Sequence, residues 1–357
     1  MNIRNIRAAA ILRAAANIRA AAFAAATLVL AAAALLALAA PARAETVKVG
    51  ITRLMGYAGV PVAEAQGYFK EQGIDIELVE FHSAAPIGVA TASGDTEFGI
   101  SGMSASFYTL AAHGQLRLIA SASQDHPGFH TLILVASNKA WDDGLRAPKD
   151  LPGHSVAITQ VGTSLEYSLG LIAKRERFAF DKLALKPLQS NPNVVSALKG
   201  GTVDAALMPA GPVLPLIDTQ EIHALGYVGE ICDGFGGSML FTSAAVANSK
   251  PDLVKRFLAA YRKGLQDLHA AFVGPKGERR DGPGAEKMWH ILTDFTQLPQ
   301  KQLADVVPYF DPKGRVDLGD VERQIAWYRA QQLLKGDVDA EKFVDKRFAL
   351  TTKATGS

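Results

Sequence analysis

Short apolar strands alternate with helices along most of this chain, and the alternation runs through two successive series. The expected strands span residues 47–51, 74–81 and 96–100 in the first series, then 155–159, 184–188 and 203–208 in the second. In each unit a loop and a helix follow the carboxyl end of a strand, a pattern that produces layered α/β structure with largely parallel sheets. The 313 residues that follow position 44 in this chain of 357 exceed the usual size of a single core. We therefore expect two similar α/β lobes.

The boundaries between the lobes are expected where polar or glycine-rich stretches interrupt the alternation. A polar stretch near residues 136–143 and a glycine-rich stretch near 226–237 both suit hinges. This division assigns residues 45–138 to the first part of lobe 1 and residues 139–232 to lobe 2. Residues 233–357 then return to lobe 1 and add C-terminal helices.

The first 44 residues, 1–44, have the three parts of a secretory signal peptide. Four arginines precede an apolar, alanine-rich run from Ala20 to Ala40, and Ala42-Arg43-Ala44 provides the cleavage site. We expect cleavage after Ala44 to release a periplasmic protein, because no later stretch approaches the length of a membrane-spanning segment. The only cysteine, Cys232, lies far from this leader, so we expect neither a lipoprotein nor an internal disulfide.

Charge and the absence of catalytic motifs argue against two large classes of function. The leader holds five arginines and no acidic residue, so its removal leaves 32 of the 37 basic residues against 35 acidic ones. Such a body lacks the concentrated basic face that nucleic-acid binding needs. The sequence contains no G-x-S-x-G elbow, no P-loop and no H-E-x-x-H, and Cys232 has no arranged base. We therefore expect a binding protein without a cofactor rather than an enzyme.

Four segments of this chain occur in the same order in a known family. They read GYFKEQGIDIE at 67–77, GDTEFGISG at 94–102, LPGHSVA at 151–157 and LKGGTVDAA at 198–206. Through them, residues 45–270 resemble the SsuA/THI5-like (NMT1-type) binding proteins of nitrate, sulfonate, taurine and related ABC importers. The resemblance implies a bilobal periplasmic-binding-protein fold with two crossover hinges, and a monomer that delivers one small molecule to a membrane permease with a cytoplasmic ATPase. It does not identify the ligand, because members also carry aromatic acids and pyrimidine precursors of thiamine.

The candidate ligand contacts lie in the loops that follow the expected strands. In open α/β sheets, ligands bind in the crevice outside the carboxyl ends of the strands, where two lobes can close over them. The resemblance places the ligand contacts of the family in the same loops. The candidates are Arg53, Leu54, Met55, Tyr57, Ser101, Met103, Ser104, Gln124, His126, Thr159, Gly162, Thr163, Ser164, Met208, Pro209 and Phe235.

These candidates favour an organic anion, either a sulfonate or an aromatic or aliphatic carboxylate. Residues 101–104 and 162–164 each place small side chains ahead of a helix, whose free backbone N–H groups attract negative charge. The planar guanidinium of Arg53 can hold an acidic group with two parallel hydrogen bonds. The alternatives are that the serines of these stretches are ordinary N-caps and that Arg53 pairs with Glu64 or another acid at the surface.

Other interpretations remain open at this point. His126 and His130 lie four residues apart, but Pro127-Gly128 between them prevents a regular helix, so we expect no metal site. A binding protein for a thiamine-precursor pyrimidine, or a ligand-sensing clamp that serves a signalling partner, would show the same sequence pattern.

Overall fold

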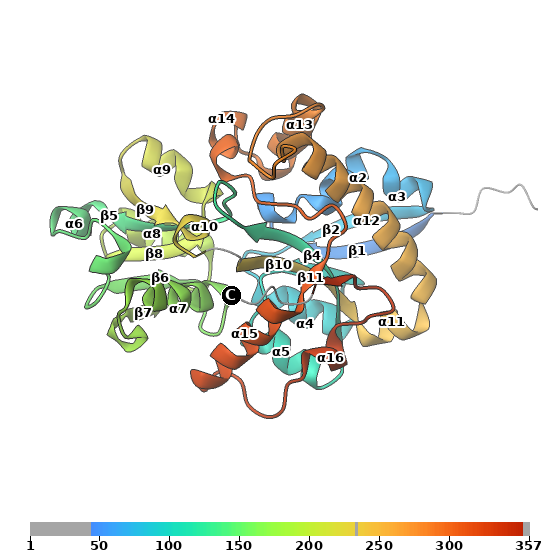
Figure 1. Cartoon of the computed structure of the whole chain (residues 1–357), viewed down its shortest axis with the longest axis horizontal. Helices are drawn as coiled ribbons and strands as arrows, with labels where there is room; N and C mark the ends of the chain where they lie inside the picture. Colours follow the sequence, from blue (N-terminus) through green and yellow to red (C-terminus); the bar gives the residue numbers. More distant parts are fainter. Residues whose placement is uncertain (1–43, 233–234, 353–357) are drawn as a thin grey trace, which may run out of the picture. The chain divides into compact units, whose positions relative to one another are not determined.

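The computed structural model describes residues 44–232 and 235–352, which contain two five-stranded sheets (Figure 1). The expected signal peptide, residues 1–44, lies outside the described residues except for Ala44. Among the described residues, no helix is long and apolar enough to cross a lipid bilayer. We call the first sheet with its covering helices lobe 1 and the second sheet with its helices lobe 2.

The sheet of lobe 1 has the strand order β2-β1-β3-β10-β4. Its strands are β1 (Glu45–Ile51), β2 (Ile74–Glu80), β3 (Phe98–Ser101), β4 (Leu116–Asp125) and β10 (Phe235–Ser243). β1 pairs in parallel with both β2 and β3, as the alternation of strands and helices predicts. β10 is antiparallel to its neighbours β3 and β4. The sheet is therefore parallel in its first half and contains one reversed strand.

The sheet of lobe 2 repeats this arrangement with the order β7-β6-β8-β5-β9. Its strands are β5 (Leu132–Ser137), β6 (Ser155–Ile158), β7 (Ala184–Pro187), β8 (Ala205–Pro209) and β9 (Ile222–Tyr227). β6 is parallel to β7 and β8, whereas β5 is antiparallel to β8 and β9. In each lobe the reversed strand is the one that enters from the other lobe.

Between the first and last described residues the chain crosses between the lobes twice, and the first crossing lies earlier than the sequence suggests. It occupies residues 126–131, between β4 and β5, rather than the polar stretch at 136–143. Residues 132–137 are all buried and form a strand between β8 and β9 of the second sheet, so they belong to lobe 2 and not to the expected segment 45–138. The polar stretch instead forms α6 (Asn138–Asp142), which follows β5. The change from an apolar strand to a polar helix looks like a lobe boundary in the sequence, because either one lowers the local hydropathy.

The second crossing runs from β9 through α10 (Val228–Ile231) to β10, within the stretch expected at 226–237. The remaining helices pack around the two sheets (Figure 1). Those that come from residues before 240 are α2 (Gly59–Ala65), α3 (Tyr68–Glu71), α4 (Ala85–Ser93), α5 (Ala105–Ala112), α7 (Ser164–Glu176), α8 (Asn191–Lys199) and α9 (Leu214–Asp218). Those that follow are α11 (Ala244–Ser249), α12 (Pro251–Phe272), α13 (Ala285–Thr296), α14 (Gln300–Leu303), α15 (Leu318–Ala330) and α16 (Ala340–Phe343), with the strands β11 (Val316–Asp317) and β12 (Thr351–Thr352).

Helix α12 packs an apolar stripe against lobe 1. Its buried residues recur every three or four positions, as in an amphipathic helix, and include Leu253, Phe257, Leu258, Tyr261, Leu265 and Leu268. Phe257 stacks on Phe98 of β3, with ring centroids 3.9 Å apart. A Cβ atom at Gly264 would lie 2.6 Å from the carbonyl oxygen of Gly59, so the close approach of α2 requires glycine here. Helix α12 thereby positions α2 and the loop between β1 and α2.

Helix α15 contacts helices of both lobes. Its side-chain cap is Asp317, which accepts hydrogen bonds from Gly319 N and Asp320 N. On lobe 1, the hydroxyl of Tyr328 donates to the carbonyl oxygen of Met103 at 3.1 Å. On lobe 2, the ring of Trp327 lies over Gly170 of α7, where a Cβ atom would approach the indole nitrogen to 2.4 Å. Helix α15 therefore forms a strap between α5 and α7.

Candidate ligand-binding site

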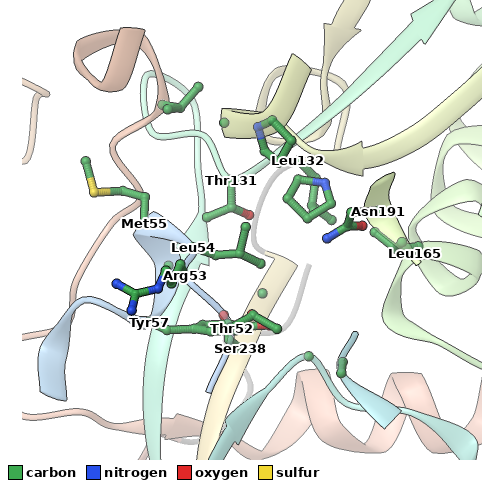
Figure 2. Close-up of a pocket in the computed structure, with 18 of the residues that line it drawn as sticks. Thr52, Arg53, Leu54, Met55, Tyr57, Thr131, Leu132, Leu165, Asn191 and Ser238 are labelled. Carbon is green, nitrogen blue, oxygen red and sulfur yellow. The ribbon is translucent and has the colours of Figure 1, made fainter. Parts of the chain in front are cut away.

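One cavity of about 180 Å³ is lined by residues of both lobes and of the C-terminal region (Figure 2). From lobe 1 come Thr52, Arg53, Leu54, Met55, Gly56, Tyr57, Ser83, Ala84, Gly102, Gly237 and Ser238. From the first crossing and lobe 2 come Thr131, Leu132, Thr159, Thr163, Ser164, Leu165, Asn191, Pro209, Gly211 and Pro212. From the C-terminal region come Thr296, Leu298, Leu303 and Val306. The cavity thus lies where the carboxyl ends of several strands meet, as expected for open α/β sheets.

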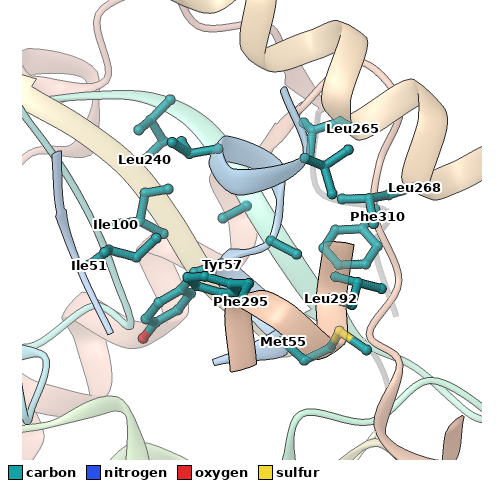
Figure 3. Packing of buried hydrophobic residues seen from close by; sticks show 14 of the residues in the cluster. Ile51, Met55, Tyr57, Ile100, Leu240, Leu265, Leu268, Leu292, Phe295 and Phe310 are labelled. Carbon is teal, nitrogen blue, oxygen red and sulfur yellow. The ribbon is translucent and has the colours of Figure 1, made fainter. Parts of the chain in front are cut away.

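The loop after β1 supplies the lobe 1 wall. It contains the short 3-10 helix η1 (Met55–Tyr57), in which all three residues are buried. A Cβ atom at Gly56 would lie 2.8 Å from the hydroxyl oxygen of Ser123, so the loop can pack this closely on β4 only with glycine. Burial raises the pKa of the Tyr57 phenol, against the smaller opposite effects of the Gly102 backbone and the Thr52 hydroxyl. Tyr57 therefore stays neutral and can serve as a hydrogen-bonding group at an apolar wall (Figure 3).

The floor of the cavity carries hydroxyl groups that are held by the crossing strands. The hydroxyls of Ser123 and Ser238 are 2.8 Å apart, and this bond links β4 to β10. Thr131 donates its hydroxyl to the Oδ1 atom of Asp125 at 2.5 Å, and the N–H of Leu132 donates to Oδ2 at 3.3 Å. Burial raises the pKa of Asp125 to about 7, so its charge changes near neutral pH. The side chains of Thr131 and Ser238 are consequently fixed at the cavity surface.

The lobe 2 wall contains the first turn of α7. Thr163 is the N-cap, but its hydroxyl donates to the Gln160 carbonyl oxygen at 2.9 Å and does not cap the helix. Within the described part of the chain, the N–H groups of Ser164 and Leu165 have no protein acceptor, and both residues line the cavity. Asn191 opens α8 beside this turn, and its buried Oδ1 atom has no hydrogen-bond partner in the described structure. The lobe 2 wall therefore offers unused hydrogen-bonding groups.

The first turn of α5, the second expected helix end, is used inside the protein. Ser104 caps the helix by accepting a hydrogen bond from Phe107 N at 3.1 Å. The N–H of Ala105 donates to the carbonyl oxygen of Gly162 in lobe 2 at 2.8 Å. The two expected helix ends thus contact each other across the cleft, and in the described structure the N–H groups without a protein acceptor at lining residues of these ends are those of Ser164 and Leu165 in α7. This contact closes one side of the cleft.

Half of the residues expected to contact the ligand line the cavity. These are Arg53, Leu54, Met55, Tyr57, Thr159, Thr163, Ser164 and Pro209. Others lie nearby with different roles: Ser101 donates its hydroxyl to the Gly102 carbonyl oxygen, and Gly162 uses its backbone groups for Ala105 and for Glu166 Oε2. Met103 and Met208 are buried in the two hydrophobic clusters instead. Their neighbours Gly102 and Pro209 line the cavity, because adjacent residues of an extended chain face opposite sides.

The remaining expected residues lie away from this cavity or outside the description. Gln124 and His126 border a separate surface hollow with Tyr309 and Arg315. The side chain of Phe235 lies outside the described residues, although its backbone pairs with Asp125. No group of three His, Cys, Asp or Glu side chains that could hold a metal ion occurs in the described ranges.

Arg53 lines the cavity, but its guanidinium binds other protein groups. Nε donates to Glu80 Oε2 at 2.8 Å, and Nη1 donates to the Phe295 carbonyl oxygen at 3.1 Å. Both charged side chains are partly in solvent, with 46% of Arg53 and 45% of Glu80 exposed. Figure 2 shows the guanidinium directed away from Asn191 and Leu165. The acid partner is thus Glu80 rather than Glu64.

Several lining residues are not apparent from the sequence pattern. Asn191 follows the end of β7, so its position after a strand is a usable signal. Thr131 belongs to the first crossing and Ser238 to β10, and the positions of both depend on the pairing of distant strands. Leu298 and Val306 come from a region without strand–loop–helix units, where no local signal indicates a site.

The fold and the cavity define a class of protein. Two α/β lobes are joined by two crossings, and loops from both sheets line the cavity. This arrangement is the periplasmic-binding-protein fold. The model of the family described as NMT1/THI5 like matches residues 55–271, which is more than half of the chain, so the chain belongs to this family. A comparison with curated proteins finds no match in sequence.

Solved structures with this fold include binding proteins of several organisms. The alkanesulfonate-binding protein SsuA from Xanthomonas axonopodis pv. citri, bound to MOPS, matches with a TM-score of 0.65 at 18% identity, over 87% of this chain and 98% of that one. The periplasmic aliphatic sulphonate binding protein SsuA from Escherichia coli matches with a TM-score of 0.64 at 18% identity, over 88% and 94%. The periplasmic nitrate-binding protein NrtA from Synechocystis PCC 6803 matches with a TM-score of 0.66 at 13% identity, over 86% of each chain. At these identities the likeness shows the shared fold.

Proposed function

We propose that this protein captures a small organic anion, a sulfonate or a carboxylate, in the cavity between its lobes. The observation that carries the proposal is the first turn of α7, where the unpaired N–H groups of Ser164 and Leu165 belong to lining residues. Such groups and the helix dipole attract negative charge. Among the described lining residues there is no aspartate or glutamate, so a cationic ligand would meet no counter-charge.

Neutral donors beside this turn support the same ligand chemistry. Thr159 contributes a hydroxyl group, and the side-chain amide N–H groups of Asn191 are further neutral donors at the cavity (Figure 2). Hydrogen bonds to a charged group are stronger than those between neutral groups, so an acidic ligand gains more here than an alcohol of the same shape. The acid group is then held by backbone and neutral side chains, without a dedicated cation.

The rest of the lining favours an anion that carries an apolar body. Leu54, Met55, Leu132 and Leu165 all face the cavity, and their burial against a hydrocarbon body releases water from apolar surface. A small inorganic anion would leave these side chains without contacts. An organic sulfonate or carboxylate satisfies both walls.

Transport is the role that the family and the related structures support. Three of the similar solved proteins are described as binding alkanesulfonate, aliphatic sulphonate and nitrate, and two of these are described as periplasmic binding proteins. We accordingly propose export by the leader at residues 1–44, action as a periplasmic monomer, and delivery of the ligand to a membrane permease that is driven by a cytoplasmic ATPase.

A thermal-shift screen of residues 45–357 tests the ligand class. The panel contains alkane- and arenesulfonates, matched carboxylates, nitrate, thiamine-type pyrimidines, and primary amines. At a hundredfold excess over Kd a bound ligand stabilises the protein by about 2.7 kcal/mol, which is readily measured. We expect stabilisation by organic anions. Stabilisation by amines or neutral pyrimidines alone would contradict the proposal.

Two further measurements separate the alternative roles. Recovery of chemically unchanged ligand after long incubation, followed by NMR, distinguishes a binding protein from an enzyme. If the adjacent genes encode a permease and an ATPase, reconstitution with those two proteins should give ligand-dependent ATP hydrolysis. A response from a neighbouring histidine kinase instead would indicate a sensing clamp.

A further inference from the structure

A segment outside the matched family region forms one wall of the cavity. Leu298, Leu303 and Val306 line it, together with Thr296 at the end of α13. The family model ends at residue 271, so these contacts belong to a region that the family pattern does not describe. Leu303 and Val306 are 1% and 2% exposed, which makes this wall a packed surface rather than a loose loop. We call residues 296–306 the C-terminal wall.

The C-terminal wall is anchored to lobe 1. Helix α13, which leads into it, packs on α12 through Trp289 and Phe272, whose ring centroids are 4.6 Å apart. The helix ends at Thr296, and Gln297 follows in a left-handed conformation with φ of 61°. The Nη1 atom of Arg53 holds the last turn through the Phe295 carbonyl oxygen. Figure 3 shows Phe295 packed beside Met55 and Tyr57, so the wall adjoins the apolar side of the loop after β1.

The same wall reaches lobe 2 and the first crossing. A Cβ atom at Gly211 would lie 3.0 Å from the Cδ1 atom of Leu298, which places this leucine in contact with lobe 2. The N–H of His130 donates to the carbonyl oxygen of Val307 at 3.0 Å, just beyond Val306. The wall therefore has a fixed position relative to both sides of the cavity, and its side chains set how much room a ligand has.

We propose that the C-terminal wall, chiefly Leu298 with Leu303 and Val306, determines which ligand body is accepted, and that it selects a compact apolar body. This inference rests on the proposed capture of an organic anion only for the identity of the acidic end. The cavity volume of about 180 Å³ is close to that of an engineered apolar cavity of about 150 Å³ that binds benzene. A single six-membered ring or a short alkyl chain is thus the size that fits.

The two ends of the cavity give the ligand an orientation. The acid group binds at the first turn of α7, and the body extends toward Met55 and the C-terminal wall. Figure 2 shows Asn191 and Leu165 on one side of the space and Met55 on the other. Each methylene that the wall buries multiplies the affinity about fourfold, until the chain reaches Leu298 and further carbons no longer fit.

Calorimetric titration with two homologous series tests the proposal. The probes are straight-chain alkane-1-sulfonates and the corresponding 1-alkanols, from two to eight carbons, with benzenesulfonate and benzyl alcohol as ring-containing members. Binding is compared for the parent, Leu298→Ala, Leu298→Trp and the matched control Leu333→Ala. Leu333 is a half-buried leucine of the same C-terminal region that packs on the second hydrophobic cluster and does not line the cavity.

We expect the parent to show an optimal chain length. Leu298→Ala should move that optimum to longer chains, and Leu298→Trp should weaken the longest bound sulfonate at least tenfold while changing ethanesulfonate less than threefold. The control should keep the parent profile. Circular dichroism and melting curves identify any variant that fails to fold, and Leu298→Phe then replaces Leu298→Trp as the smaller increase in side-chain volume.

The outcomes separate this proposal from the proposed function. If sulfonates bind and their affinity depends on chain length in the same way in every variant, the role of the wall is overturned and anion capture stands. If alkanols bind and the Leu298 variants change how their affinity depends on chain length, while sulfonates do not bind, the wall is supported and anion capture is contradicted. Failure of every alkyl and ring-containing probe to bind the parent would also overturn the proposal, because a compact apolar body is what the wall is inferred to accept.

Discussion

The contact between Gly102 and Ser164 provides a direct test of whether ligand capture needs the closed cleft seen here. Gly102 belongs to lobe 1 and Ser164 to lobe 2, and both line the cavity. A Cβ atom at Gly102 would lie 2.3 Å from Ser164 Oγ and 3.1 Å from its Cβ. Gly102→Ala therefore forces this side of the cleft apart. Overpacking of this kind costs about 1 to 3 kcal/mol, so Kd for the anion should rise about 5- to 140-fold.

The assay is calorimetric titration with the anion that stabilises the parent most. The melting temperature of the unliganded variant should stay close to that of the parent, because the cleft can open and so remove the clash. Gly102→Ala combined with Ser164→Gly should recover most of the affinity. The matched control is Gly88→Ala on α4, where the nearest atom to a new Cβ, Leu116 Cδ1, is 3.9 Å away. A Kd within twofold of the parent for Gly102→Ala would refute the reasoning.

Three further predictions concern side chains at the cavity. Arg53→Ala should change ligand affinity less than threefold, because the guanidinium binds Glu80 and Phe295 and exposed pairs contribute only about 0 to 1 kcal/mol; a tenfold loss in titration would show that Arg53 exchanges these partners for the ligand. Asn191→Ala should weaken anion binding about fivefold by removing one hydrogen bond, whereas the exposed Asn193→Ala should not, and equal affinities would exclude Asn191 from the site. Burial raises the pKa of Asp125 to about 7 from an ordinary 3.8. Its contribution to the free energy of unfolding is therefore complete below about pH 4 and is lost as the pH rises through 7, by up to about 4 kcal/mol. Urea unfolding at pH 5 and pH 8 should show a smaller difference for Asp125→Asn than for the parent, and identical slopes with pH would contradict this origin.

The alternation of strands and helices predicts the two sheets because it reflects local patterns of burial. Each parallel strand of the first series falls within a few residues of its expected place, as β1 and β2 show. The first crossing was misplaced because β5 pairs with strands more than sixty positions away, and no local pattern indicates which sheet a buried strand joins. The missing catalytic motifs favour a binding protein, whereas the role in an ABC importer follows only from the family resemblance.

The candidate site is predictable only at the level of loops. The sequence places Gly102 and Met103 side by side, but packing decides that the first lines the cavity and the second is buried. Arg53 illustrates the same limit, since its partner Phe295 is separated from it by 242 positions. The C-terminal wall could not be predicted, because the three-dimensional path of α13 brings it to the cavity without any motif.

The two reversed strands impose an order on the completion of the lobes during folding. All five strands of lobe 2 lie in one continuous stretch, from Leu132 to Tyr227, whereas the sheet of lobe 1 lacks the strand between β3 and β4 until β10 is made. The lobe that the chain starts first is thus the one it finishes last. A chain that stopped after Tyr227 would hold a finished second sheet and a first sheet in which β3 and β4 have no strand between them. Their unpaired edges would then be open to strands from other molecules, so premature truncation at the second crossing should yield aggregation rather than half of a working protein.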